Sequence, residues 1–217
     1  MNRRQFLRTS ALGLSALAVP GALSCSRKAH AKPNVVYILA DDLGYAELGC
    51  YGQEIIQTPN LDRMAAEGVR FTQHYSGSPV CAPSRCVLLT GKHTGHSYIR
   101  DNGRAPGRPY DPEKGLFPGQ NPIPDREFTL AEALKEQGYV TASIGKWGLG
   151  YEGSTGDPNR QGFDLFFGYY CQVHAHNHYP RYLWRNGEKV ELEGNTRGLT
   201  GKHYSTDLFA DEAKRFI

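Results

Sequence analysis

Hydrophobic and polar positions change period along this chain, and the changes predict alternating strands and helices. Residues 34–40 (NVVYILA) form a continuous apolar run rich in β-branched side chains, which is typical of a strand buried on both faces. Residues 58–68 carry apolar positions at helical spacing between a Thr-Pro start and a glycine stop. Residues 69–75 alternate as a strand does. The first third of the sequence therefore predicts strand, helix and strand in succession.

The remaining elements are predicted mainly by local start and stop signals. Thr129 and Glu132 form a capping box that begins a helix, and Gly138 ends it. Asn186 and Gly187 form the two-residue turn of a hairpin. The further predicted elements are a helix over residues 81–90, a Pro- and Gly-rich loop over 105–124, a strand over 139–144, the hairpin strands within 182–192 and a helix over 205–217.

Residues 1–31 have the composition of an export signal. Arg3 and Arg4 precede Phe6 and Leu7, and an uncharged stretch of apolar and small residues follows over residues 11–23. Adjacent arginines ahead of such a stretch are the pattern of a twin-arginine signal. The sequence therefore predicts a domain boundary after residue 31, transport by the twin-arginine translocase and a periplasmic location.

Two processing sites fit the end of this signal. Residues 29–31 (AHA) match the A-x-A pattern and favour cleavage after Ala31. Cys25 follows Ala-Leu-Ser, a degenerate lipobox, and would instead leave the protein lipid-anchored. Cleavage after Ala31 removes five basic residues and no acidic one, so the formal net charge changes from +3 to −2. The basic balance therefore belongs to the signal, and we expect no nucleic-acid partner.

Cys81 stands at the predicted start of a helix, in the sequence Cys-Ala-Pro-Ser-Arg. Pro83 suits the first helical position, and Arg85 follows within the first turn. Backbone N–H groups at a helix start, together with a guanidinium, make a site for a tetrahedral oxyanion. The alternative is a loop-to-helix junction with a small buried cysteine.

Asp41 and Asp42 follow the apolar run of residues 34–40 directly. Two adjacent carboxylates at the carboxyl end of a buried strand occupy the place where open α/β sheets bind ligands. A divalent cation with oxygen ligands would relieve their repulsion. The alternative is a helix cap or a solvated turn.

Two further segments carry candidate chemistry. Residues 145–150 (GKWGLG) follow a predicted strand, and their glycines let the backbone approach an anion to which Lys146 adds a charge. His174, His176 and His178 share one face if their segment is extended, which permits a transition-metal site. A surface loop with incidental histidines is the other interpretation.

Three of these segments, in this order, resemble the formylglycine-dependent (type I) sulfatases of the alkaline phosphatase superfamily. Asp-Asp-Leu-Gly-Tyr after Ala40 is similar to the first metal-binding segment of the family. Cys-x-Pro-x-Arg at Cys81 resembles the first signature, and Gly-Lys-Trp at Lys146 resembles the second. The sequence departs from the second signature at Gly148, where the family has a histidine that contacts the nucleophile.

The resemblance covers residues 33–217 and implies a fold and a reaction. The implied fold is α/β, an alkaline-phosphatase-like sandwich with a largely parallel central sheet flanked by helices. The implied reaction is hydrolysis of a sulfate ester to an alcohol and inorganic sulfate. A maturation enzyme would convert Cys81 to formylglycine, whose hydrated form attacks sulfur through one hydroxyl and expels sulfate through the other.

The resemblance also implies roles for individual residues. Asp41 and Asp42, with the modified Cys81, would bind Ca²⁺ rather than Mg²⁺. Arg85 and Lys146 would hold the aldehyde hydrate and the sulfate oxygens. Among the histidines we favour His176 as the residue that takes the place of the one missing at position 148.

Other functions stay open on the sequence. A phosphodiester or phosphonate monoester hydrolase of the same superfamily shares the Cys-x-Pro-x-Arg pattern. A non-catalytic protein that binds sulfated carbohydrate would also keep such a scaffold. Because family members are about twice as long, residues 32–217 are expected to be the N-terminal part of a catalytic domain, inactive by themselves.

Overall fold

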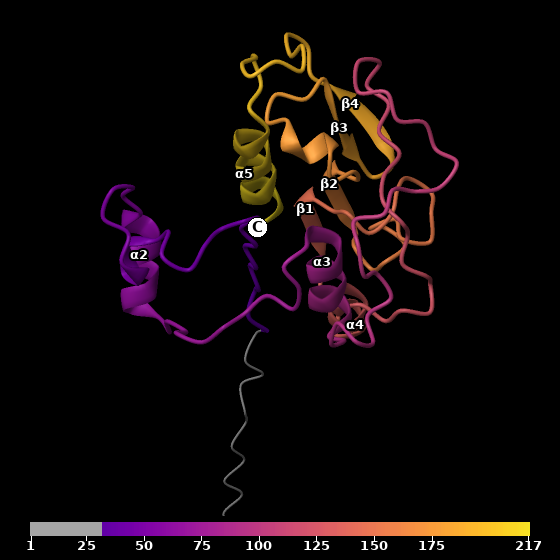
Figure 1. Cartoon of the computed structure of the whole chain (residues 1–217). Helices are drawn as coiled ribbons and strands as arrows, with labels where there is room; N and C mark the ends of the chain where they lie inside the picture. Colours follow the sequence, from indigo (N-terminus) through magenta and orange to yellow (C-terminus); the bar gives the residue numbers. More distant parts are fainter. Residues whose placement is uncertain (1–31) are drawn as a thin grey trace, which may run out of the picture. The chain divides into compact units, whose positions relative to one another are not determined.

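The computed structural model describes residues 32–217 (Figure 1). The chain divides into two compact units, the first ending at Asp42 and the second covering Leu43–Ile217. The predicted export signal and both of its processing sites lie outside the described residues.

The prediction of a buried strand over residues 34–40 is wrong. These residues have no strand pairing, and the five large apolar side chains at positions 35–39 are between 41% and 79% exposed. A strand that is apolar on both faces needs neighbouring strands for its backbone and packed layers for its side chains. The described part of the first unit, residues 32–42, supplies neither.

The second unit begins with a short 3-10 helix, η2 (Gly49–Tyr51), and the predicted helix, α2 (Pro59–Glu67). Thr58 precedes α2 but does not cap its amides. Its hydroxyl accepts a hydrogen bond from Gly49 N at 2.8 Å, so it ties α2 to η2. The predicted strand over residues 69–75 is wrong, because this stretch has no partner strand and leaves Phe71 and Tyr75 exposed.

The two central helices match their sequence signals. Helix α3 (Cys81–Thr90) begins at Cys81 itself, so Pro83 occupies its third position rather than its first. Proline is accepted there because the first N–H groups of a helix have no partner within it. Helix α4 (Leu130–Glu136) has the predicted capping box, in which Glu132 N donates to the Thr129 hydroxyl at 3.3 Å and Thr129 N donates to Glu132 Oε2 at 2.7 Å.

A four-stranded mixed sheet forms the centre of the second unit. The strands are β1 (Ala142–Lys146), β2 (Leu165–Tyr169), β3 (Tyr182–Arg185) and β4 (Glu188–Glu191), in that spatial order. Strands β1 and β2 are parallel, and the other two pairings are antiparallel. The hairpin turn is confirmed, with positive φ at Asn186 (47°) and Gly187 (86°), as a type I′ turn requires. Strand β2 was not among the predicted elements.

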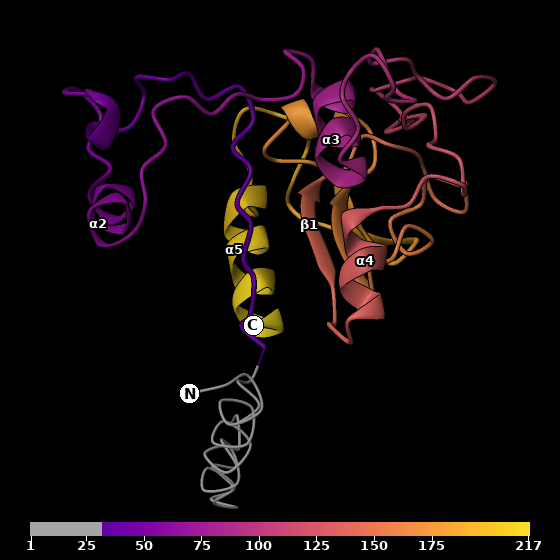
Figure 2. The ribbon, with the colours of Figure 1, turned by 90° about the horizontal axis from the view of Figure 1, so that it is seen from below.

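Helices cover both faces of this sheet. Phe166 and Tyr170 pack with Ala82 and Cys86 of α3 on one face. On the other face Phe167 and Tyr169 pack with Leu208 and Phe209 of α5 (Ser205–Phe216). Figure 2 shows β1 between α5 on one side and α3 and α4 on the other. The predicted α/β architecture is therefore confirmed in this unit.

The guanidinium of Arg185 fixes α5 to the sheet through both carboxylate oxygens of Glu212, each at 2.7 Å. This hydrogen bonding, with a second contribution from Arg215, lowers the pKa of Glu212 to about 2.

Strands β1 and β2 approach each other closely where two glycines pair. Gly145 lies opposite Gly168, and a Cβ at position 168 would collide with the backbone of Gly145. Gly145 also has a φ of 109°, which departs from regular strand geometry.

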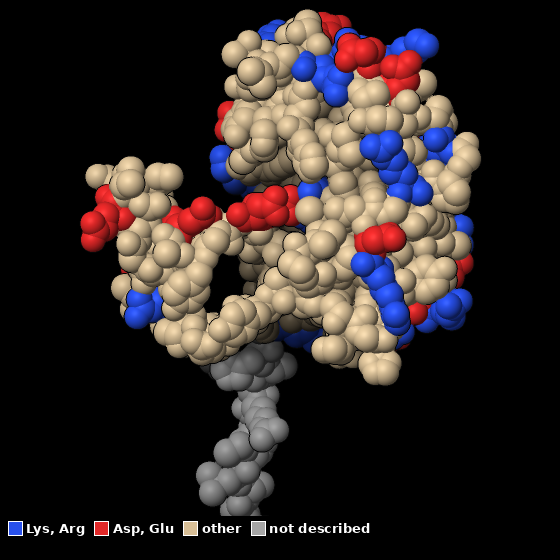
Figure 3. All heavy atoms as spheres, in the orientation of Figure 1, with Lys and Arg blue, Asp and Glu red and all other residues tan. Residues whose placement is uncertain are grey.

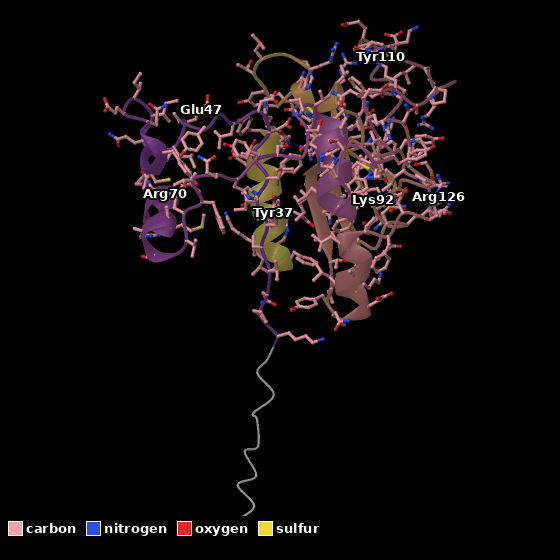
Figure 4. All side chains as sticks on the ribbon, turned by 60° about the horizontal axis from the view of Figure 1, so that its bottom comes forward. Tyr37, Glu47, Arg70, Lys92, Tyr110 and Arg126 are labelled. Atoms are coloured by element: carbon pink, nitrogen blue, oxygen red, sulfur yellow. The ribbon has the colours of Figure 1, made fainter. Side chains whose placement is uncertain are left out.

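Residues 105–124 form the predicted long loop, which includes Tyr110 (Figure 4). The hairpin anchors this loop, since the Tyr182 hydroxyl donates to Gly115 O at 2.9 Å and Arg181 donates to Glu113 O at 2.8 Å. Figure 3 shows basic and acidic side chains interspersed over the visible face around β3 and β4. None of the helices in residues 32–217 is long and apolar enough to span a bilayer.

Candidate functional site

Cys81 and Lys146 meet at the ends of two secondary-structure elements. Cys81 is the half-buried first residue of α3, and Lys146 is the last residue of β1. The Lys146 ammonium lies 3.4 Å from Cys81 Sγ. A positive charge therefore lies beside the residue whose formylglycine form the family resemblance implies as the nucleophile.

Arg85 joins the same site from α3. It lies one helical turn after Cys81, and its guanidinium donates to the backbone oxygen of Lys146. The structure thus brings together three of the predicted residues, with the Lys146 ammonium beside the thiol and the Arg85 guanidinium at the backbone of Lys146. Such an arrangement is suited to binding and stabilising a tetrahedral oxyanion.

The segment that follows the C-terminal end of α3 makes contacts of its own, apart from this site. Lys92, just after the helix, forms an ion pair with the buried carboxylate of Glu127 (Lys92 is labelled in Figure 4). Arg126, which precedes Glu127 in the sequence, has its guanidinium over the ring of Tyr98, 5.5 Å from the ring centroid (Arg126 is labelled in Figure 4). These contacts lie at the C-terminal end of α3, at the opposite end of the helix from Cys81.

A chain of amide side chains that the sequence did not single out supports the start of α3. Ala82 N donates to Asn102 Oδ1 at 2.9 Å, and Gln120 Nε2 donates to Asn102 O at 2.9 Å. Gln120 Oε1 in turn accepts from Gln172 N at 3.0 Å. No spacing rule connects positions 82, 102, 120 and 172, so only the folded chain reveals this network.

A side chain at position 148 would have to displace the side chain of Gln172. Gly148 has a φ of 85°, and a Cβ there would collide with the carboxamide of Gln172. The Gln172 side chain therefore occupies the space into which a residue at position 148 would project.

The histidine segment is not extended, so the condition under which three histidines would share one face is not met. His174 and His176 lie in a 3-10 helix, η3 (His174–His176), because the chain turns at residues 173–177. His174 is buried, whereas His176 and His178 are exposed. Within residues 32–217 the three histidines bring no metal-sized group of ligand atoms together. The role of His176 at the nucleophile stays a prediction.

His174 is a packing residue. Its ring stacks on Phe117 with centroids 4.2 Å apart, and Tyr169 and Tyr182 lie against it. Burial, and to a smaller extent the charges of Lys189 and Arg197, lowers the pKa of His174 to about 3.

Asp41 and Asp42 end the first unit, whereas Cys81 belongs to the second. Both aspartates are exposed, and Asp42 has a φ of 58°, an uncommon value outside glycine. Exposed carboxylates are the donors that Ca²⁺ and Mg²⁺ prefer, so this pair fits such an ion chemically. Joint binding of a cation with residue 81 stays a prediction.

Comparisons with known proteins agree on one family. The family model described as Sulfatase matches residues 33–217. N-acetylgalactosamine-6-sulfatase of Canis lupus familiaris is 41% identical over 223 aligned residues, which cover 99% of this chain and 40% of that protein. Steryl-sulfatase of Rattus norvegicus is 40% identical over 152 residues, covering 66% of this chain and 25% of that protein. This chain thus spans less than half the length of these relatives.

Solved structures give the same result. Ps i-CgsB matches with a TM-score of 0.66 and 29% identity over 86% of this chain and 41% of that one. BT4656, solved in complex with its substrate D-glucosamine-2-N,6-O-disulfate, matches with a TM-score of 0.62 and 31% identity over 86% of this chain and 31% of that one. The site at Cys81, the fold around it and these matches lead to one conclusion: the chain belongs to the type I sulfatases of the alkaline phosphatase superfamily.

Proposed function

We propose that the protein hydrolyses sulfate esters to an alcohol and inorganic sulfate, with residue 81 as the nucleophile. The observation that carries this proposal is that the Lys146 ammonium lies beside Cys81, while the Arg85 guanidinium, from the same helix as Cys81, donates to the backbone oxygen of Lys146. The sulfate group of the ester is negatively charged throughout the reaction, and two cationic side chains would stabilise that charge.

Conversion of Cys81 to formylglycine would supply a hydrated aldehyde, which the proposed mechanism needs for attack on sulfur and for release of sulfate. The Lys146 ammonium would then face the oxygens at residue 81. Arg85 would hold the end of β1 in place through the Lys146 carbonyl, and its guanidinium would add positive charge near the sulfate group. Asp41 and Asp42 would contribute carboxylate ligands to Ca²⁺, which stabilises developing negative charge when bound.

We infer a sulfated sugar as the class of substrate. The matched N-acetylgalactosamine-6-sulfatase and the BT4656 complex with a sulfated glucosamine both support this class. We further propose export through the twin-arginine translocase, on the strength of Arg3 and Arg4. Replacing both arginines by lysine should leave the protein in the cytoplasmic fraction.

The decisive experiment pairs mass spectrometry with kinetics on the full-length protein, because residues 32–217 are expected to be inactive by themselves. The peptide containing Cys81 should have the mass of formylglycine in active protein. An aryl sulfate should be turned over faster than the matching aryl phosphate, and Cys81→Ala should abolish turnover while the melting transition is kept. A faster aryl phosphate would favour the phosphoesterase alternative, and unchanged turnover by Cys81→Ala would reject the mechanism.

A further inference from the structure

Gln172, two residues after Tyr170, is a buried amide that the rest of the described chain leaves unsatisfied. It is only 3% exposed, and neither Nε2 nor Oε1 has a hydrogen-bond partner among residues 32–217. Buried side-chain amides normally have partners, because an unmade hydrogen bond is costly. An unpartnered amide beside Gly148, two residues after Lys146, therefore points to a ligand that completes it.

The backbone fixes where this amide lies. Beyond the end of β1, Trp147 N donates to Tyr169 O at 2.9 Å and Gly148 N donates to Tyr170 O at 3.2 Å. These bonds continue the pairing of β1 with β2 and bring Gly148 beside the segment that carries Gln172. The absence of a side chain at position 148, two residues after Lys146, leaves the space that the carboxamide fills.

The same residue is connected to the nucleophile through the amide network. Gln172 N donates to Gln120, Gln120 donates to Asn102, and Asn102 accepts from Ala82, the neighbour of Cys81. Gln172 is therefore held both to the β1 end that bears Lys146 and to the start of α3 that bears Cys81.

We propose that the Gln172 carboxamide is a substrate-binding residue, which donates a hydrogen bond from Nε2 to an oxygen of the bound sulfate group. It performs this role from the space beside Gly148, whereas His176 is exposed on η3. The inference rests on the proposed sulfatase function. A carboxamide does not titrate, so its contribution to sulfate binding should be constant between about pH 5 and 8, unlike that of a histidine.

The test uses Gln172→Met, which keeps the length of the side chain and removes its hydrogen bonding, and Gln172→Glu, which replaces the donor by a negative charge. Binding of inorganic sulfate is measured by calorimetry at constant ionic strength, with chloride as the replacement salt, and KM for an aryl sulfate is measured in parallel. Gln172→Met should bind sulfate about tenfold to a hundredfold more weakly than wild type. Gln172→Glu should bind it more weakly still, and it serves alone if Gln172→Met does not fold.

Gln161→Met is the matched control. Gln161 is another fully buried glutamine; its Nε2 donates to Thr155 O at 2.8 Å, and only its Oε1 lacks a partner among the described residues. Its replacement should lower the melting temperature and leave sulfate affinity unchanged. Gln172→Met should weaken sulfate binding without lowering the melting temperature, because it removes an unsatisfied amide from the unliganded fold.

The outcomes separate this inference from the function on which it rests. If the wild-type protein turns over the sulfate ester and Gln172→Met has the same sulfate affinity and KM, the role of Gln172 is overturned and the proposed function stands. A second outcome is a wild-type sulfate affinity that changes with a group titrating near pH 6.5 and that neither Gln172 variant alters. This outcome would assign the role to a histidine and overturn the role of Gln172. Full-length wild-type protein without sulfate-ester turnover overturns the proposed function and this inference together.

Discussion

The Lys146 ammonium lies 3.4 Å from Cys81 Sγ, although 65 positions separate the two residues along the chain. The contact exists because α3 packs on the face of β2 that carries Phe166 and Tyr170, beside the end of β1. Packing of the apolar core therefore determines the charge next to the candidate nucleophile.

Replacement of Lys146 by methionine should lower kcat for a sulfate ester about a hundredfold, because one preorganised charge at the reacting group is lost. Lys146→Arg should recover part of the rate. The control is Lys92→Met, at the other end of α3, which breaks the ion pair with Glu127 but should leave kcat unchanged. Equal rates for Lys146→Met and wild type would remove Lys146 from the mechanism.

Replacement of Asp41 and Asp42 together by asparagine should release the bound divalent cation and most of the activity. The cation loses two anionic ligands, and neutral amide oxygens bind Ca²⁺ more weakly. Elemental analysis of the purified variant measures the occupancy. Asp125→Asn is the control, because Asp125 is an exposed aspartate whose ion-pair partner is Arg160. Full occupancy in the double variant would reject this pair as ligands.

Substitutions at Gly148 and Gln172 should be energetically coupled. Gly148→Ala should destabilise the fold through its positive φ and through collision with the Gln172 side chain. Adding Gln172→Ala removes only the collision, so a double-mutant cycle should give a coupling energy of about 0.5–3 kcal/mol.

Gly138→Ala is a control that separates the two causes of destabilisation by Gly148→Ala, the positive φ and the collision with Gln172. Gly138 has a φ of 79° but nothing within 4 Å of its Cβ position, so its replacement measures conformational strain alone. Additive effects at positions 148 and 172 in denaturant unfolding would contradict the packing described above.

His174 should make the stability of the protein acid-sensitive. Burial lowers its pKa from 6.5 to about 3, so below pH 6.5 the unfolded chain binds a proton that the folded protein does not bind. The free energy of unfolding should therefore fall by about 2 kcal/mol between pH 7.5 and 5 through this residue. His174→Phe, which keeps a ring against Phe117, should flatten the dependence in urea unfolding.

The carboxylate of Glu212 does not contribute to the pH dependence of the free energy of unfolding between pH 7.5 and 5. Its pKa is lowered from 4.5 to about 2, so the stability that it contributes is present above pH 4.5 and is lost only as the pH falls toward 2. A His174→Phe variant with the same pH dependence as wild type between pH 7.5 and 5 would contradict the assignment to His174.

Local signals in the sequence were sufficient for several elements. The capping box at Thr129 and the Asn186-Gly187 turn act over a few residues, so each is formed as predicted. The grouping of Cys81, Arg85 and Lys146 was available from the resemblance to a family. No local pattern could have placed Lys146 within reach of Cys81.

Features that depend on distant partners were missed or predicted wrongly. The apolar pattern of residues 34–40 predicts a strand, but strand formation depends on a neighbouring strand that residues 32–42 do not contain. Strand β2 is specified by its pairing with β1 and β3 and by packing on both faces. Gln172 showed no motif, because its importance comes from Gly148 and Gln120, which lie 24 and 52 positions earlier in the sequence.

The place of β1 has a consequence for handling the protein in solution. Among the four strands of the sheet in the described residues β1 forms an edge, and an edge strand is the part of a sheet with which a strand from another molecule can pair. Gly145 interrupts regular strand geometry just before Lys146, so the regular edge extends over residues 142–144 only. Such a short edge should favour weak, reversible self-association at high concentration over the growth of ordered fibrils.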